Sequence, residues 1–300
     1  MSHNHSHEIT SHNRSFAIGI ALNVIFVVIE FGYGILADSL ALMADAGHNL
    51  SDVVGLLLAW GAAVLATKAA TEKRTYGFRK ATIIASLASA ILLFVALGGI
   101  AWEAIGRFAH PKPVEGMTVI VVAAIGVVIN TLTALLFAKG QKDDLNIRGA
   151  FLHMSADAGI SLGVVVAGIL MMVNGWLWID PIVSLAIVAI IFIGTWGLLQ
   201  DSFNYAIDAV PKRIDIGEIS QYMLSFDCVD HIHDLHVWPL STTEVALTVH
   251  LVVNSHSLDN RFLWTLQHHL HDQFGIEHAT IQVENSMGEN NCMLDQYKCS

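Results

Sequence analysis

The sequence predicts an α-helical membrane protein with six transmembrane helices, followed by a small α+β domain in the order αββαβ. Of the 300 residues, 54% are hydrophobic and 14% are charged, whereas a soluble globular chain carries about 25% charged residues. Residues 15–206 contain six apolar stretches, each long enough to cross ~30 Å of hydrocarbon as a helix of about 20 residues. Residues 207–285 have the composition of a soluble domain and include a strand-like alternation of apolar and polar residues.

The first 14 residues form a polar tail that has no apolar core and no small-residue cleavage site. These absences exclude a signal peptide. An engineered tag is the alternative interpretation, and the irregular histidine spacing argues against it. The tail histidines are His3, His5, His7 and His12.

Six apolar stretches make up the predicted transmembrane domain, and the breaks between them carry turn residues and charges. Asp38 and Asp180 fall at helix ends, where solvent or N-capping explains them. The stretches are Phe16–Leu36, Ser39–Thr67, Ala81–Gly106, Met117–Ala138, Gly149–Asn174 and Trp178–Gln200.

The basic residues predict the orientation of these helices. The N-terminus and the loops after the second and fourth stretches carry nine Lys and Arg residues, against two on the opposite side. Because cytoplasmic loops are enriched in Lys and Arg, we expect both the N-terminus and the C-terminal domain in the cytoplasm.

The C-terminal domain is predicted to contain two helices on one face of a mixed three-stranded sheet. A polar tail, residues 286–300, follows it. The chain has three cysteines, which are too few and too near the C-terminus for a disulfide scaffold; Cys292 and Cys299 are a weak signal for a zinc pair. The predicted elements are helix Ile216–Phe226, strands Val229–Leu240 and Glu244–Val253, helix Arg261–Phe274 and strand Ala279–Glu284.

Two apolar stretches contain the same spacing of ionisable residues. The second has His48 and Asp52, and the fifth has His153 and Asp157, so both read HxxxD. Residues four apart share one helix face, so each pair presents an imidazole and a carboxylate together. Two facing pairs would supply two nitrogen and two oxygen ligands, a tetrahedral set suited to Zn²⁺.

Helix rise places the two pairs at overlapping depths in the bilayer. Counted at 1.5 Å per residue from the predicted helix ends, His48 and Asp52 lie roughly 14 and 20 Å from the outer face, and His153 and Asp157 roughly 24 and 18 Å. The two pairs can therefore share one ion. The alternative is that each pair only makes hydrogen bonds between helices, and two copies at one depth argue against it.

Other polar residues lie in the same helices. Asp45 precedes His48 by about one turn, Glu30 and Asn23 lie in the first stretch, and Asn130 lies in the fourth. We expect Asp45, Glu30 and Asn23 to form a second shell or a proton path. The alternative is that they join helices by hydrogen bonds.

The chain contains 16 histidines, more than its 15 Lys and Arg residues together, and many lie in the C-terminal domain. His233 and His250 fall on neighbouring predicted strands, and Glu284 ends the last one. This arrangement predicts a regulatory metal site. The alternative is a solvated acidic surface that binds metal loosely.

Several function classes are excluded. The net charge is −11, and most of it falls after residue 206, which argues against nucleic acid because phosphate binding needs a basic surface. There is no GxxxxGK[ST] motif for ATP and no HExxH motif for a metalloprotease.

The chain resembles the cation diffusion facilitator family. The resemblance rests on the six spans with paired HxxxD, on the second-helix segment Ser39–Asp52, and on two C-terminal segments, His233–Trp238 and His278–Glu284. It covers residues 14 to 284.

The resemblance implies a homodimeric transporter that exchanges Zn²⁺ for protons by alternating access, with a ferredoxin-like cytoplasmic domain that binds zinc near the dimer interface. It assigns His48, Asp52, His153 and Asp157 to the transport site, and His233, His250 and Glu284 to ligand positions of the domain. His at position 48, rather than Asp, is similar to members that favour Zn²⁺ over Cd²⁺ or Mn²⁺.

The chain also departs from the family pattern. Gln282 stands where some members have a ligating His, and the loop from Lys68 to Lys80 has no His. The loop between the fourth and fifth stretches lacks a His-rich insertion, which favours a bacterial exporter in the cytoplasmic membrane.

Two other functions remain to be weighed. A membrane metal sensor with no net flux is the first. A membrane metalloenzyme is the second, and it is disfavoured because four protein ligands leave no open position for water.

Overall fold

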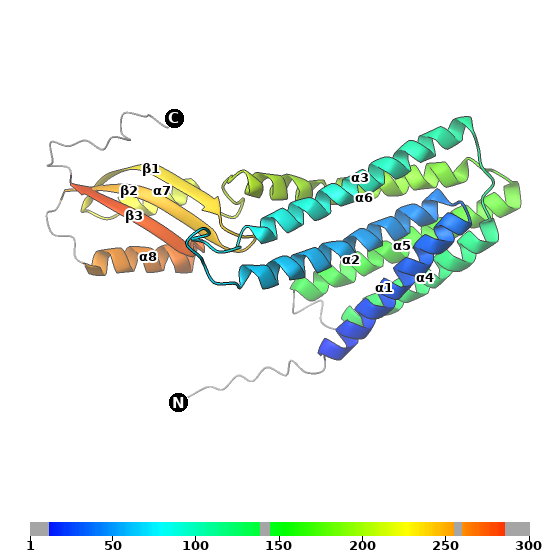
Figure 1. Cartoon of the computed structure of the whole chain (residues 1–300), viewed down its shortest axis with the longest axis horizontal. Helices are drawn as coiled ribbons and strands as arrows, with labels where there is room; N and C mark the ends of the chain where they lie inside the picture. Colours follow the sequence, from blue (N-terminus) through cyan, green and yellow to red (C-terminus); the bar gives the residue numbers. More distant parts are fainter. Residues whose placement is uncertain (1–11, 139–144, 255–259, 286–300) are drawn as a thin grey trace. The chain divides into compact units, whose positions relative to one another are not determined.

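The computed structural model describes residues 12–138, 145–254 and 260–285 (Figure 1). The N-terminal tail through residue 11, residues 139–144, His256 and the tail with Cys292 and Cys299 lie outside the described residues. The described residues form two compact units. One contains residues 12–57 together with the described residues of 89–197, and the other contains residues 58–88 together with the described residues of 198–285.

Six long helices precede the C-terminal domain, in agreement with the predicted architecture. By length and composition, five helices in the described part of the chain can cross a membrane, and the described side chains of α1 add a shorter apolar segment, Val24–Leu36. The helix α1 begins at His12, inside the predicted polar tail. The bounds are α1 His12–Leu36, α2 Leu40–Ala66, α3 Ala81–Ala109, α4 Gly116–Phe137, α5 Leu145–Asn174 and α6 Ile179–Ala206.

The helices alternate in direction. At one end, α1, α3 and α5 finish and α2, α4 and α6 begin; we call it the distal end, and the opposite end the proximal end. At the distal end the backbone N–H of Glu115, before α4, donates to the carbonyl of Ala37, between α1 and α2 (3.2 Å). Consequently α2 runs from distal to proximal, and α5 runs the other way.

The first unit buries several polar and ionisable side chains within its interior and leaves many large apolar side chains exposed. Glu30, Asp45 and Asn130 are fully buried, whereas Trp102 and Ile193 are 81% and 76% exposed. Such a distribution suits a protein whose surroundings are hydrocarbon, where ionisable groups face the bundle interior.

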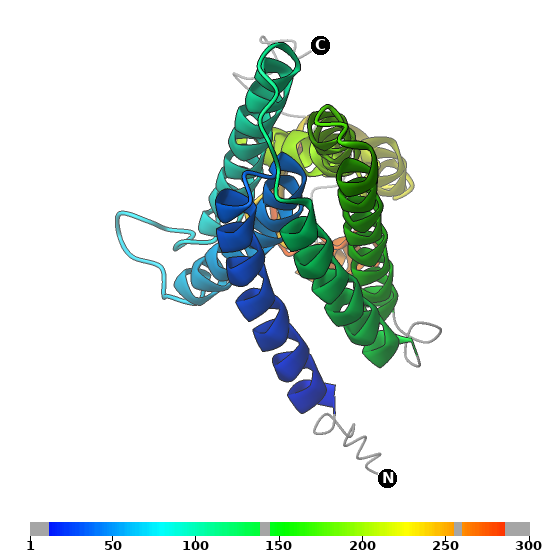
Figure 2. The same ribbon diagram turned by 90° about the vertical axis from the view of Figure 1, so that its right-hand side faces the viewer.

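Helices α4 and α5 run side by side (Figure 1 and Figure 2) and approach closely. A Cβ at Gly168 of α5 would lie 2.8 Å from Cγ1 of Ile120 and 3.4 Å from the carbonyl oxygen of Gly116. Small residues at such a crossing let helix backbones approach in a membrane.

The C-terminal domain has the predicted order αββαβ. Its sheet has the order β1-β2-β3, in which β2 is antiparallel to β1 and parallel to β3. The sheet is therefore mixed, as the sequence predicts. The bounds are α7 Ile216–Leu224, β1 Val229–Pro239, β2 Val245–Val253, α8 Asn260–Phe274 and β3 His278–Asn285.

One face of β2 forms the core of this domain. Its alternate residues, among them Leu247 and Leu251, are buried together with Ile219 and Met223 of α7 and Leu266 of α8. Successive strand residues point to opposite faces, so His250 lies on the face of the sheet away from this core.

Candidate metal sites

The two HxxxD pairs occupy single faces of α2 and α5. His48 and Asp52 are four residues apart in α2, and His153 and Asp157 are four apart in α5. Because α2 and α5 run in opposite directions, the distal member of one pair lies opposite the distal member of the other. His48 therefore faces Asp157, and Asp52 faces His153.

Four contacts join the side chains into one cluster. Nε2 of His153 lies 3.1 Å from Oδ2 of Asp52 and 3.6 Å from Oδ2 of Asp157. Nε2 of His48 lies 3.6 Å from Oδ2 of Asp52 and 3.9 Å from Oδ1 of Asp157. The two imidazole rings are nearly perpendicular, with centroids 5.8 Å apart.

These separations are compatible with a shared tetrahedral ion. With metal–ligand distances of 2.0–2.1 Å, the ligand atoms of a tetrahedral zinc site lie about 3.3 Å apart, and the four contacts fall on either side of that length. His48, His153 and Asp157 each offer a ligand atom within 4.8 Å of the others. Among the described residues, Nδ1 of His48 and one carboxylate oxygen each of Asp52 and Asp157 are buried without a hydrogen-bond partner.

The four side chains differ in exposure. His153 and Asp52, the proximal members, are 43% and 36% exposed, whereas His48 and Asp157 are 10% and 1% exposed. The cluster is therefore accessible at its proximal side and closed at its distal side.

A fully buried polar layer closes the distal side. Oδ2 of Asp45 accepts a hydrogen bond from Ser161 Oγ (2.7 Å), and Asn49 Nδ2 donates to the Asp45 carbonyl oxygen (3.1 Å). Glu30 lies beside Asp45 and is also fully buried. No hydrogen bond of standard geometry reaches its carboxylate oxygens from the described residues.

The structure says less about the two asparagines of the predicted spans, Asn23 and Asn130. The side chain of Asn23 lies outside the described part of the chain, although its backbone belongs to α1. Asn130 of α4 is fully buried, and its amide group has no hydrogen-bond partner within the described residues.

His233, His250 and Glu284 form a second cluster, in the C-terminal domain. His233 pairs directly with His250 across β1 and β2. Oε1 of Glu284 lies 2.7 Å from Nδ1 of His250, and Oε2 lies 3.2 Å from Nε2 of His233. These three residues each offer a ligand atom within 4.8 Å of the others. Gln282 Nε2 donates a hydrogen bond to Oε1 of Glu284 (3.0 Å), so Gln282 contacts the carboxylate of the cluster.

Other histidines of the domain have different neighbours. The pairing of β1 with β2 is irregular between His233 and His236, where Asp234 has a φ of 52°. Nε2 of His236 lies 2.9 Å from Oδ1 of Asp234. His269 stacks on Tyr222. His271 lies 2.8 Å from Asp272, and this hydrogen bond raises the pKa of His271.

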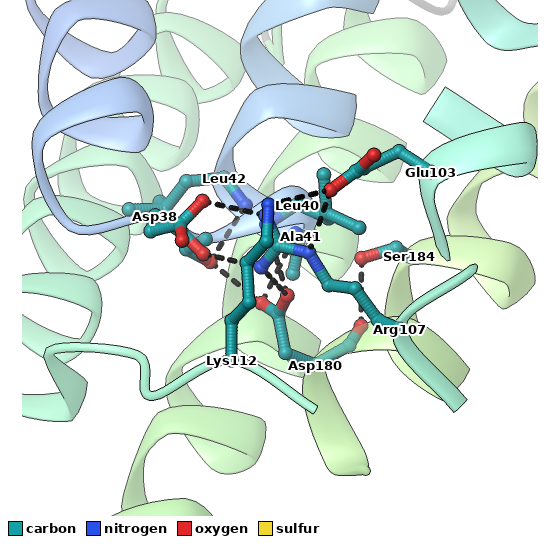
Figure 3. A network of polar contacts seen from close by, with 10 residues as sticks. Asp38, Leu40, Ala41, Leu42, Glu103, Arg107, Lys112, Asp180 and Ser184 are labelled. Carbon is teal, nitrogen blue, oxygen red and sulfur yellow. Dashed lines mark hydrogen bonds and ion pairs between the residues drawn. The ribbon is translucent and has the colours of Figure 1, made fainter. Parts of the chain in front are cut away.

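The explanation of Asp180 by solvent is wrong. Its side chain is fully buried and accepts hydrogen bonds from the first residues of α2, not of its own helix (Figure 3). Arg107, which the sequence did not single out, is 4% exposed and lies in the same network. In the sequence Arg107 directly follows the third apolar stretch, and no residue near it in the chain points to Asp180.

Comparison with known proteins assigns both parts of the chain to one family. Residues 16–205 match the cation efflux transmembrane domain, and residues 211–286 match the cation efflux protein cytoplasmic domain. Over 287 residues the chain is 36% identical to the cation efflux system protein CzcD of Alcaligenes sp. (strain CT14), an alignment that covers 95% of this chain and 90% of that protein.

Two further relatives align over nearly the whole chain. The zinc transporter ZitB of Escherichia coli (strain K12) is 36% identical over 295 residues, with 95% of this chain and 93% of that protein covered. A cadmium, cobalt and zinc/H(+)-K(+) antiporter of Bacillus subtilis (strain 168) is 33% identical over 304 residues, with 99% and 97% covered. The chain therefore belongs to the cation diffusion facilitator family and is a metal cation efflux transporter, not an enzyme.

Proposed function

We propose that this transporter exports Zn²⁺ in exchange for protons by alternating access. The transported ion binds between α2 and α5, where His48, Asp52, His153 and Asp157 are its ligands. The observation that carries the proposal is the contact of the two HxxxD pairs, with nitrogen–oxygen distances between the pairs of 3.1 and 3.9 Å.

The donor set supports zinc as the substrate. Imidazole nitrogen suits Zn²⁺ better than it suits Mg²⁺, Ca²⁺ or Mn²⁺, which prefer oxygen. Two carboxylates also balance the charge of a divalent ion in a low-dielectric surrounding. The name of ZitB, a zinc transporter, points to the same ion.

Proton exchange follows from the chemistry of the ligands. Zinc binds imidazole and carboxylate only when both are deprotonated, so protons and metal compete for the same atoms. Histidine suits this competition because its unperturbed pKa of ~6.5 lies near the working pH. Protons that replace the metal at the distal side would return with the empty site to the proximal side.

Asp45 and Glu30 extend this polar interior towards the distal end. Both are fully buried, and Asp45 is held by Ser161, one turn from Asp157. We assign them to a second shell or a proton path, because ionisable groups inside a membrane span mark such relays. Asn23 shares this assignment from its position in α1.

His233, His250 and Glu284 are proposed to bind a regulatory Zn²⁺. Two imidazoles and one carboxylate are a zinc-type donor set, and the three ligand atoms lie close enough to share an ion. Two such C-terminal domains, one from each chain, would pair and so join two chains as a homodimer in the lipid bilayer.

The proposed location is the cytoplasmic membrane, with both termini in the cytoplasm, because Lys and Arg concentrate at the proximal loops and the N-terminus.

The test is Zn²⁺ flux in proteoliposomes, with a trapped metal dye and a luminal pH probe. Zinc uptake with opposite proton movement, lost in Asp52→Ala, is the expected result. Asp201→Asn is the matched control, because this residue makes an exposed ion pair with Lys212 (2.6 Å). Zinc binding without flux under any pH gradient would favour the sensor instead.

A further inference from the structure

A buried network at the distal end joins α6 and α3 to the start of α2 (Figure 3). Asp180 of α6 accepts hydrogen bonds from Ser39 Oγ (2.7 Å), Leu40 N (2.9 Å) and Ala41 N (3.2 Å). Ser39 Oγ in turn accepts from the N–H of Leu42 (3.3 Å), so the start of α2 is capped jointly by its own Ser39 and by a carboxylate of another helix. The first N–H groups of a helix have no partner within the helix, so a carboxylate at this position satisfies them and complements the helix dipole.

Arg107 of α3 completes the network. Its Nη1 lies 3.5 Å from Oδ2 of Asp180 and donates to the carbonyl oxygen of Asp38 (2.5 Å), while Nη2 donates to Oδ1 of Asp38 (2.6 Å). Asp38 has a φ of 50° in the turn before α2. One guanidinium thus contacts both the capping carboxylate and the turn that it caps.

The network fixes the helix that carries two of the proposed ligands. His48 lies eight residues after Leu40, about 12 Å along the helix axis, and Asp52 is one turn further. The described part of α2 between these points is a continuous helix. A shift of its first turn against α3 and α6 would therefore move His48 and Asp52 against His153 and Asp157.

Burial distinguishes this network from a surface ion pair. Exposed pairs contribute little because water screens them, whereas Asp180 is fully buried and Arg107 is 4% exposed. Removal of one buried partner leaves the other uncompensated. The capped turn thus depends on both residues.

We propose that Asp180 and Arg107 are positioning residues for the transported ion: they hold the start of α2, and through it His48 and Asp52, in register with α3 and α6. This inference rests on the proposed function, because it takes His48 and Asp52 as ligands. Neither residue touches the ion; both act through α2.

The experiment measures the zinc dissociation constant of the purified full-length protein by competition with a zinc dye. Every protein carries His250→Ala, so that the C-terminal cluster does not contribute. Asp180→Asn keeps the side-chain volume but removes the charge and one acceptor, and we expect zinc affinity to fall about tenfold. The matched control Asp201→Asn should change it by less than about twofold.

A double-mutant cycle separates positioning from general destabilisation. If Asp180 acts through the α2 ligands, Asp180→Asn should weaken zinc binding less in an Asp52→Asn background, where the other three ligands still give a measurable affinity, than in the protein with Asp52 intact. An unchanged affinity in Asp180→Asn alone, or an equal loss in both backgrounds, would overturn the inference.

Should Asp180→Asn fail to yield folded protein, Ser39→Ala replaces it. That variant removes one donor to Asp180 and the acceptor of the Leu42 N–H, with an expected loss of about threefold, and no loss would again overturn the inference. If Asp52→Asn itself leaves zinc binding intact, the proposed function fails, which is a separate outcome.

Discussion

Oδ2 of Asp52 lies 3.1 Å from Nε2 of His153, the shorter of the two His–Asp contacts that join α2 to α5. The two residues belong to the proximal, more exposed side of the cluster. Their contact brings a carboxylate of one helix against an imidazole of the other. A cation between them would have ligands from both helices, so its binding and release would be linked to their separation.

Replacement of Asp157 by Asn should reduce zinc flux by about 100-fold or more, because the most buried ligand loses its charge while keeping its volume. The measurement is initial zinc uptake into proteoliposomes. Asp201→Asn, the same change at an exposed ion pair, should retain uptake. Flux close to that of the unmodified protein in Asp157→Asn would remove Asp157 from the site.

Replacement of His48 by Asp should broaden metal selectivity. The change converts a donor set of two nitrogens and two oxygens into one nitrogen and three oxygens, and carboxylate oxygen suits Mn²⁺ better than imidazole does. We expect the ratio of Zn²⁺ to Mn²⁺ uptake to fall about tenfold. An unchanged ratio in competition flux assays would show that position 48 does not set selectivity.

Replacement of His250 by Ala should lower the zinc stoichiometry of the full-length protein by one ion per chain. This histidine contacts Glu284 at 2.7 Å and faces His233 across the sheet. Equilibrium dialysis in an Asp52→Ala background isolates the C-terminal site. His271→Ala, at an exposed residue outside the cluster, is the control and should leave the stoichiometry unchanged. Equal stoichiometry in both variants would contradict a metal site at His250.

Two glycines of α5 should respond differently to alanine. At Gly163 a Cβ meets nothing within 4 Å, whereas at Gly168 it would lie 2.8 Å from Ile120 Cγ1. Alanine favours a helix by about 1 kcal/mol over glycine, but overpacking costs about 1–3 kcal/mol. We expect Gly168→Ala to lower the thermal midpoint of the detergent-solubilised protein and Gly163→Ala to keep or raise it. The reverse order would mean that α4 and α5 do not approach closely at Gly168.

Local patterns were sufficient to predict much of this protein. The six spans, the order αββαβ and the buried face of β2 follow from apolar stretch length and from the two-residue period of strands. The pairing of His48 with Asp52, and of His153 with Asp157, on single helix faces follows from the helical repeat. These features depend only on residues close together in the sequence.

Contacts between distant segments required the tertiary structure. The sequence places Asp180 at the start of α6, but only the fold brings it to the first N–H groups of α2, where it caps a helix 140 residues earlier. The contacts of Arg107 likewise depend on the fold, because its partner Asp38 lies 69 residues earlier in the sequence. The irregularity of β1 at Asp234 puts His236 opposite Thr248, on the same face of the sheet as His250, and it also has no signature in the strand pattern.

The sequence by itself thus determined which residues share a face of each helix or strand, because that depends on the backbone repeat alone. The tertiary structure decided which faces meet. The depth count predicted that the two HxxxD pairs could be level, but their contact, and the capping of α2 by Asp180, depend on how the helices pack. Packing is a property of side-chain shapes over the whole bundle, and no local period encodes it.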